Sequence, residues 1–274
     1  MDTIVLENPQ GDKLTVTPYA AHVLSWETRN NEQQLFLSEQ AIFTEGKAIR
    51  GGVPVIFPQF NEFGPVQRHG FARNQMWQVS SQSDTHIVLT LSANPTTKQL
   101  WPYDFIATYR VELGDQQIVL SLQVENRDTK SFEFTSALHT YLAVNQLGEA
   151  QLSGLDNHSF WSNDGGSFSE RQTETSPQLT FLDTLETGID RVYFAVKKPL
   201  ILQDGKKSLA IAMTGFDDVV VWNPGAEAVT QMADMSNEEY ARMLCVEAAR
   251  IDNPIKLNPE ESWCGSQTLS LQSD

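Results

Sequence analysis

Positive charge is scarce in this sequence. The chain has 19 Lys and Arg against 35 Asp and Glu, which gives a formal net charge of −16. Surfaces that bind nucleic-acid phosphates or anionic membranes need clustered basic residues. We therefore expect no nucleic-acid partner and no membrane-surface binding. A small anionic substrate fits this composition only if a few arginines gather locally against the overall field.

Cysteines and long apolar runs are also scarce. The only cysteines are Cys245 and Cys264, and neither stands in a CxxC or other metal-ligand spacing. We expect two buried free thiols in a reducing compartment, with a disulfide as the alternative. The N-terminus lacks the pattern of a signal peptide, and no stretch approaches the ~20 apolar residues of a membrane span. The expected location is the cytoplasm.

Short β-type runs dominate the sequence, and 40% of the residues are hydrophobic, enough for a sizeable core. Alternating or apolar runs separated by turn residues favour an antiparallel sandwich or barrel, and no linker or repeat divides the chain. We expect one all-β domain over residues 1–274, a monomer, with a long loop over 162–178. One helical turn is predicted at Ser236–Met243, because Ser236 and Glu239 match a capping box. The predicted strands are 4–6, 14–18, 86–92, 106–113, 118–124, 132–144, 191–196, 209–214, 219–222 and 243–247, with a hairpin connection at 114–117.

Four basic side chains gather in two short segments, 50–60 and 68–74. Gly51-Gly52 permits positive φ or a close backbone approach, and two prolines make the first segment stiff and irregular. The basic residues could bind a phosphate or sugar hydroxyls through arginine, or the arginines could simply pair with surface carboxylates. No GxGxxG or Gly-Lys-Ser/Thr motif is present, so we expect no nucleotide. The four residues are Arg50, Arg68, His69 and Arg73.

One histidine and one glutamate interrupt apolar β-type runs. In a regular strand Ala137, His139 and Tyr141 share a face, which makes His139 either a core residue or a proton-transfer group near neutral pH. Glu247 ends the apolar run that begins at Met243. Glutamate is seldom fully buried without a partner, so Glu247 either reaches solvent or acts in a cleft.

Three further residues are candidates for sugar contacts. Asp190 could accept hydrogen bonds from hydroxyls or pair with Arg191. Trp222 and Asn223 end a strand, where the indole could stack on a sugar ring or pack in the core. The remaining histidines have no second ligand at metal spacing, so no metal is expected at His22, His86 or His158.

Five ordered motifs together resemble the aldose 1-epimerase superfamily, and more narrowly its glucose-6-phosphate 1-epimerase branch (hexose-6-phosphate mutarotases). The resemblance runs from about Leu14 to Leu271. The motifs are Arg-Gly-Gly-Val-Pro-Val-x-Phe-Pro from Arg50, His-Gly-Phe-Ala-Arg-Asn from His69, Leu-His-Thr-Tyr around His139, Val-Trp-Asn-Pro with the later Met-Ala-Asp-Met, and Cys-Val-Glu ending at Glu247. One departure is Arg68, which stands where some family members have glutamine; Gln67 lies one residue earlier.

The resemblance implies a galactose mutarotase-like β-sandwich with little helix, no cofactor, and anomerisation of a hexose 6-phosphate. By motif match, Glu247 would be the base at O1 and His139 the acid at the ring oxygen. By the same match, Arg50, Arg73 and Asp190 fall at positions that bind sugar or phosphate, and His69 is their neighbour in the same cleft. We predict further substrate contacts from Arg68, Gln59, Asn223 and Trp222. The alternatives are an aldose 1-epimerase for unphosphorylated hexoses and a non-catalytic carbohydrate-binding sandwich, which would have little need for the acid–base pair.

Overall fold

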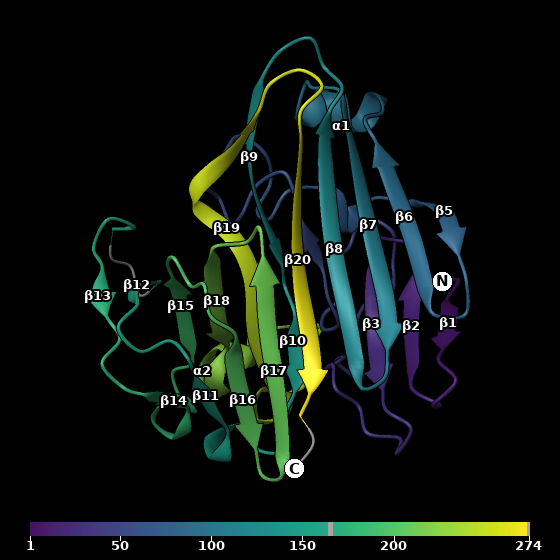
Figure 1. Cartoon of the computed structure of the whole chain (residues 1–274). Coiled ribbons are helices and arrows are strands. Elements are labelled where there is room, and N and C mark those ends of the chain that lie inside the picture. Colours follow the sequence, from purple (N-terminus) through teal and green to yellow (C-terminus); the bar gives the residue numbers. More distant parts are fainter. Residues whose placement is uncertain (164–166, 273–274) are drawn as a thin grey trace.

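The computed structural model describes residues 1–163 and 167–272 and consists mainly of antiparallel strands (Figure 1). The segments whose alternating sequence predicts a strand form strands in the structure. In β7 (Phe105–Gly114) and β8 (Gln117–Asn126), every second side chain is buried. A two-residue turn at Asp115 and Gln116 joins these strands, as predicted. Strict alternation buries one face of this hairpin and leaves the other half-exposed.

The hairpin belongs to a nine-stranded sheet that forms one layer of the sandwich (Figure 1). Neighbouring strands in this sheet pair antiparallel throughout. In spatial order the strands are β14 (Gln178–Thr180), β11 (Gln151–Ser153), β16 (Leu200–Asp204), β17 (Lys207–Thr214), β20 (Ser262–Leu271), β8, β7, β6 (His86–Ser92) and β5 (Gln78–Gln82).

A second, eight-stranded sheet lies behind the first in Figure 1 and carries the residues of interest. Its order is β13 (Gln172–Thr173), β12 (Ser159–Ser162), β15 (Ile189–Tyr193), β18 (Asp218–Asn223), β19 (Met243–Leu257), β9 (Phe132–Leu138) and β4 (Val55–Ile56), with β10 (Tyr141–Ala143) also paired to β19. A small third sheet contains β1 (Ile4–Glu7), β2 (Lys13–Thr17) and β3 (His22–Glu27).

The helices of the described residues are short. They are α1 (Pro95–Leu100), α2 (Gly225–Val229) and the 3-10 turns η1 (Ala72–Asn74), η2 (Leu147–Glu149), η3 (Leu182–Thr184) and η4 (Glu239–Arg242). The helical turn predicted at Ser236–Met243 is present as the 3-10 turn η4. The Glu239 carboxylate accepts the backbone N–H of Ser236, but it also accepts Ser38 Oγ–H and the backbone N–H of Glu39. These tertiary hydrogen bonds fix the segment against the loop at Ser38 and Glu39, which is far away in sequence, and the segment does not continue as a longer helix.

The main core fills the space between the two large sheets. It includes Leu120 and Ile211 from the nine-stranded sheet and Val221 and Val246 from the eight-stranded sheet. Because side chains alternate along a strand, the neighbours of these core residues on β18 and β19 point to the opposite face. That outer face of the eight-stranded sheet holds the candidate site.

Both cysteines are free, as expected, but only Cys245 is buried. Cys264 is exposed, so the prediction of two buried thiols is wrong for this residue. It lies on β20 opposite Gln123, and its neighbour Gly265 is the residue that faces inward.

Gly51 and Gly52 lie where the chain enters the second sheet, and both have positive φ, 111° and 61°. A Cβ on Gly52 would lie 2.1 Å from the backbone oxygen of Val23 and 2.7 Å from Nε2 of His22. The backbone of this motif therefore fits only where glycine permits a close approach.

We expect Gly52→Ala to lower the free energy of unfolding by about 3 kcal/mol or more, because it combines an unfavourable φ with a clash against backbone. Chemical denaturation of the variant measures this loss. Gly46→Ala is the matched control, since Gly46 also has positive φ (81°) but has open space around it. An equal loss in both variants would contradict a role for close packing at Gly52.

Candidate active site

His139 lies at a break between two strands. The prediction of one strand over 132–144 is wrong there, because β9 ends at Leu138 and β10 begins at Tyr141. The His139 backbone N–H donates to Pro54 O, and the Thr140 N–H turns back to Leu138 O. The break holds the imidazole at the surface of the outer face with only 8% of the residue exposed.

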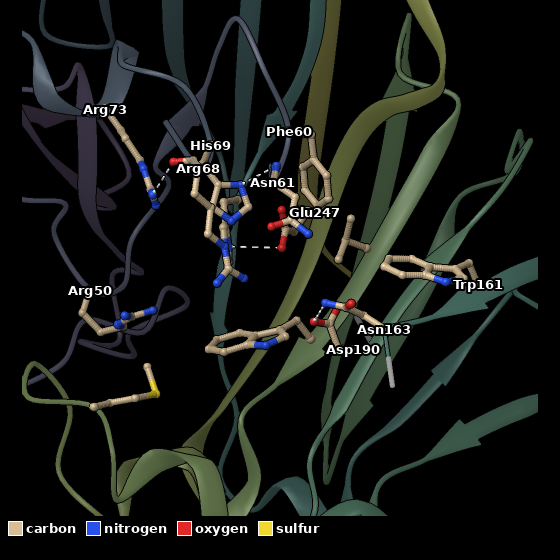
Figure 2. Close-up of a pocket in the computed structure, with 14 residues that line it drawn as sticks. Arg50, Phe60, Asn61, Arg68, His69, Arg73, Trp161, Asn163, Asp190 and Glu247 are labelled. Atoms are coloured by element: carbon tan, nitrogen blue, oxygen red, sulfur yellow. Dashed lines mark hydrogen bonds and ion pairs between the residues drawn. The ribbon is translucent and has the colours of Figure 1, made fainter. Parts of the chain in front are cut away.

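Glu247 lies on β19, next to this break. The register pairs Leu138 with Ala248 and Tyr141 with Cys245, which brings Glu247 beside His139. Their closest approach is 3.3 Å between His139 Nδ1 and Glu247 Oε1, drawn as the dashed line to Glu247 in Figure 2. Glu247 is 2% exposed. The predicted pair therefore meets, although the two residues are far apart in sequence.

The pair lies in a cavity of about 350 Å³, a size typical of small-molecule sites. Arginines lie on one side of it, and Asp190, Asn163 and Trp161 lie opposite (Figure 2). The lining residues are Arg50, Phe60, Asn61, Arg68, His69, Arg73, His139, Trp161, Asn163, Asp190, Val220, Trp222, Met232 and Glu247. Eight of the ten predicted site residues are in this set.

The three arginines of the cavity differ in their partners. Arg50 donates through Nε to Asp234 (3.2 Å) and through Nη1 to the Tyr141 hydroxyl (3.0 Å). Arg73 donates to the backbone oxygen of Arg68. Within residues 1–163 and 167–272, neither Arg68 nor Arg73 forms an ion pair with a carboxylate. Of the three, only Arg50 is paired with a carboxylate in the described structure, so Arg68 and Arg73 face the cavity outside any ion pair.

His69 is fixed in one tautomer. Its backbone has positive φ (65°), and its Nδ1 accepts the backbone N–H of Asn61 at 3.2 Å. Nδ1 therefore carries no proton, so the proton of the neutral ring is on Nε2. Burial, with the charge of Arg73 adding to it, lowers the pKa of His69 to about 3. His69 can therefore serve the cavity as a neutral hydrogen-bond donor.

Asp190 on β15 and Trp222 on β18 are directly paired across these two neighbouring strands. Asp190 accepts the side-chain amide of Asn163 (2.9 Å) and forms no ion pair with Arg191, which is held by Glu174. Burial raises the pKa of Asp190. The carboxylate remains on the cavity wall with further acceptor capacity for a hydroxyl group.

Two predicted substrate contacts do not line this cavity. Gln59 is 2% exposed, and its amide bonds the backbone of Asn61 and Val66, which shapes the adjoining loop. Asn223, also 2% exposed, donates to the backbone oxygens of Tyr240 and Met243. It borders a second cavity of about 510 Å³ that shares Asp190 and Trp222 with the first. The polar atoms of both side chains are bonded within the fold, and their predicted substrate contacts stay predictions.

The sequence reasoning missed several cavity residues. Phe60 and Trp161 form apolar walls, and Asn163 orients Asp190. Asn163 is the second residue of the predicted loop 162–178, of which residues 164–166 lie outside the described part of the chain. Asp234 was visible within the Met-Ala-Asp-Met motif, but only the fold places it beside Arg50.

Burial changes the proton affinities of the central pair in opposite directions. It raises the pKa of Glu247 well above its usual value; Asp190 raises it further, and Arg73 and Arg68 oppose the shift. Burial also lowers the pKa of His139 well below its usual value. A high carboxyl pKa and a low imidazole pKa keep one proton on the pair over a wide pH range around neutrality.

This arrangement predicts a plateau in activity that ends where the pair loses its proton at alkaline pH. Asp190→Asn removes the negative neighbour that raises the pKa of Glu247. The proton should then leave at lower pH, and the alkaline limb of kcat/KM should move toward neutrality. Measuring both proteins on the same substrate cancels the titration of the substrate itself. An alkaline limb that stays in place or moves to higher pH would contradict this electrostatic account.

No helix of the described residues is long and apolar enough to cross a membrane. No three His, Cys, Asp or Glu side chains of residues 1–163 and 167–272 are grouped as ligands for a metal ion.

Solved structures with the same architecture define the class of this protein. A mutarotase-like protein from Salmonella typhimurium, described as a "putative mutarotase", superposes with a TM-score of 0.87 at 29% identity, covering 100% of this chain and 91% of the other. A galactose mutarotase related enzyme from Lactobacillus acidophilus has a TM-score of 0.80 at 14% identity, covering 99% and 98%. The chain thus has a galactose mutarotase-like, mostly antiparallel β fold, as predicted.

Sequence comparison makes the assignment more specific. The profile of the Aldose 1-epimerase family matches residues 2–270. A protein of Cenchrus ciliaris named "putative glucose-6-phosphate 1-epimerase" is 34% identical over 289 residues, with 98% of this chain and 84% of the relative covered. The chain belongs to the aldose 1-epimerase family.

Proposed function

We propose that the protein interconverts the α and β anomers of a hexose 6-phosphate, with glucose 6-phosphate as the first candidate. The observation that carries this proposal is the 3.3 Å contact of His139 with Glu247 in a cavity that is also lined by Arg68 and Arg73, neither of them ion-paired among the described residues. The name of the Cenchrus ciliaris relative supports the same substrate.

The reaction needs two coupled proton transfers. In ring opening, the Glu247 carboxylate takes the proton of the C1 hydroxyl while protonated His139 gives its proton to the ring oxygen, and the C1–O5 bond breaks. The product is the open-chain aldehyde with neutral His139 and protonated Glu247. Rotation about C1–C2 presents the other carbonyl face. The C5 hydroxyl then attacks C1, His139 recovers the proton of that hydroxyl, and Glu247 returns its proton to O1.

The pair carries one proton in both states, so the catalyst ends each cycle as it began. Burial favours the neutral form of each partner, which is the form present while the chain is open. The 3.3 Å approach of Nδ1 to Oε1 places the two proton-carrying groups next to each other. Positioned proton transfer typically accelerates a reaction by about 10²–10⁴-fold.

The phosphate part of the proposal rests on the arginine side of the cavity. A phosphate monoester carries close to two negative charges near neutral pH. One charge pair at 4 Å contributes about 4 kcal/mol at an effective dielectric of 20, so two or three arginines can outweigh the acidic surface. Asp190 and Trp222, on the other walls, would then hold the hydroxyls and the face of the sugar ring.

The test is exchange NMR of the anomeric protons with a panel of substrates at equal protein concentration. The panel contains glucose, galactose and mannose 6-phosphates and the three free sugars. We expect faster exchange for at least one 6-phosphate than for its free sugar. Equal catalysis of both would point to an unphosphorylated aldose as substrate, and binding without exchange would point to a carbohydrate-binding protein.

A further inference from the structure

Tyr141 connects the arginine side of the cavity to the catalytic histidine. Its ring is stacked on the imidazole of His139, with centroids 4.7 Å apart and planes inclined by 8°. Its hydroxyl accepts a hydrogen bond from Arg50 Nη1 at 3.0 Å. The same guanidinium donates through Nε to Asp234 at 3.2 Å. The phenol of Tyr141 therefore contacts both Arg50, a candidate phosphate-binding residue, and His139, the candidate proton donor.

Tyr141 does not line the cavity in the described structure, and it is 2% exposed. Its backbone is fixed by bonds to Gly52 and Phe36 and by pairing with Cys245. Trp222 packs against its edge, with ring centroids 6.0 Å apart. Tyr141 is therefore a rigid, buried element that acts on a substrate only through Arg50 and His139.

Arg50 keeps donors for a ligand while it is held in this way. A guanidinium has five N–H donors, and the bonds to Asp234 and Tyr141 use two, which leaves three. Because its planar fork is fixed on one edge, the free donors point in a defined direction. An anion bound there would meet an arginine whose position is tied to the plane of the His139 ring.

We propose that Tyr141 is a positioning residue that couples phosphate binding at Arg50 to the alignment of His139. This inference rests on the proposed function. Binding energy from the non-reacting phosphate would be used in the transition state and would raise kcat, not only lower KM. A hexose 6-phosphate would then be favoured over the free hexose in turnover as well as in binding.

Tyr141→Phe tests the coupling, because it keeps the ring stack and removes only the hydroxyl. We expect kcat on glucose 6-phosphate to fall about tenfold, which corresponds to about 1.4 kcal/mol for one hydrogen bond to a charged group. Tyr109→Phe is the matched control. Tyr109 is buried on β7, and its hydroxyl has no partner among the described residues. This control should leave kcat and KM as in the wild type.

A double-mutant cycle separates coupling from a general structural effect. Arg50→Lys keeps the positive charge but loses the two-sided fork that reaches Tyr141 and Asp234. If Tyr141 acts through Arg50, Tyr141→Phe lowers kcat about tenfold in the wild type and less than twofold in the Arg50→Lys background. The same fold-loss in both backgrounds, or no loss in either, would overturn the inference.

The failure of this inference is distinguishable from failure of the proposed function. If wild-type protein exchanges no hexose 6-phosphate, the proposed function fails. If wild-type protein is active and the cycle is additive, the function stands and the coupling through Tyr141 is wrong.

Discussion

Glu247→Gln is expected to lower kcat for anomer exchange by about 10²–10⁴-fold, because the amide cannot accept the proton of the C1 hydroxyl. The variant should remain folded, since burial already favours the neutral form of this side chain and glutamine has nearly the same shape. Exchange NMR with glucose 6-phosphate gives the rate, and circular dichroism with thermal unfolding gives the folded state.

His139→Asn provides the second arm of this prediction. It should lower kcat by a similar factor, and the double variant should lose little more than either single variant, because the two groups act as one unit. His86→Asn is the matched control, since His86 lies on β6 outside the cavity. A folded Glu247→Gln or His139→Asn protein with wild-type exchange would remove that residue from the mechanism.

Arg73→Met is expected to reduce kcat/KM on glucose 6-phosphate by about 10²-fold, since a lost bond to a charged group costs about 1.5–3 kcal/mol. Burial lowers the pKa of Arg73 to about 10, so the guanidinium is still charged at neutral pH. The loss of kcat/KM that Arg73→Met causes on free glucose should be much smaller, because that substrate has no phosphate. The comparison of the two substrates in steady-state exchange measures the difference.

Arg110→Met is the control for the charge itself. Arg110 lies on β7 in a surface ion pair with Glu112, so the variant makes the same change in net charge away from the cavity. It should leave kcat/KM unchanged on both sugars. If Arg73→Met lowers activity on glucose and on glucose 6-phosphate by the same factor, Arg73 holds the sugar and not the phosphate.

Much of the fold was predictable because two-residue alternation is a local property of the sequence. The hairpin from Phe105 to Asn126 formed with the expected turn. The motifs also identified His139 and Glu247, and their meeting follows from the antiparallel register of β9 and β19. What local patterns could not provide was the break after Leu138, which depends on a backbone bond to Pro54.

Tertiary placement accounts for the remaining differences. Gln59 and Asn223 stand within motifs that supply the cavity, yet the folded chain uses their amides to bond its own backbone. Conversely, Asp234 meets Arg50 across 184 residues of sequence. A pattern in sequence indicates which side chains are available, and only packing decides whether a polar group faces the cavity or the fold.

The central claim is most directly tested by the exchange rate between the α and β anomeric protons of glucose 6-phosphate at catalytic protein concentration. The account predicts a rate that rises in proportion to wild-type protein and returns to the protein-free value when Glu247→Gln is substituted. A rate equal to the protein-free value with wild-type protein, for every hexose 6-phosphate and free hexose in the panel, would contradict it.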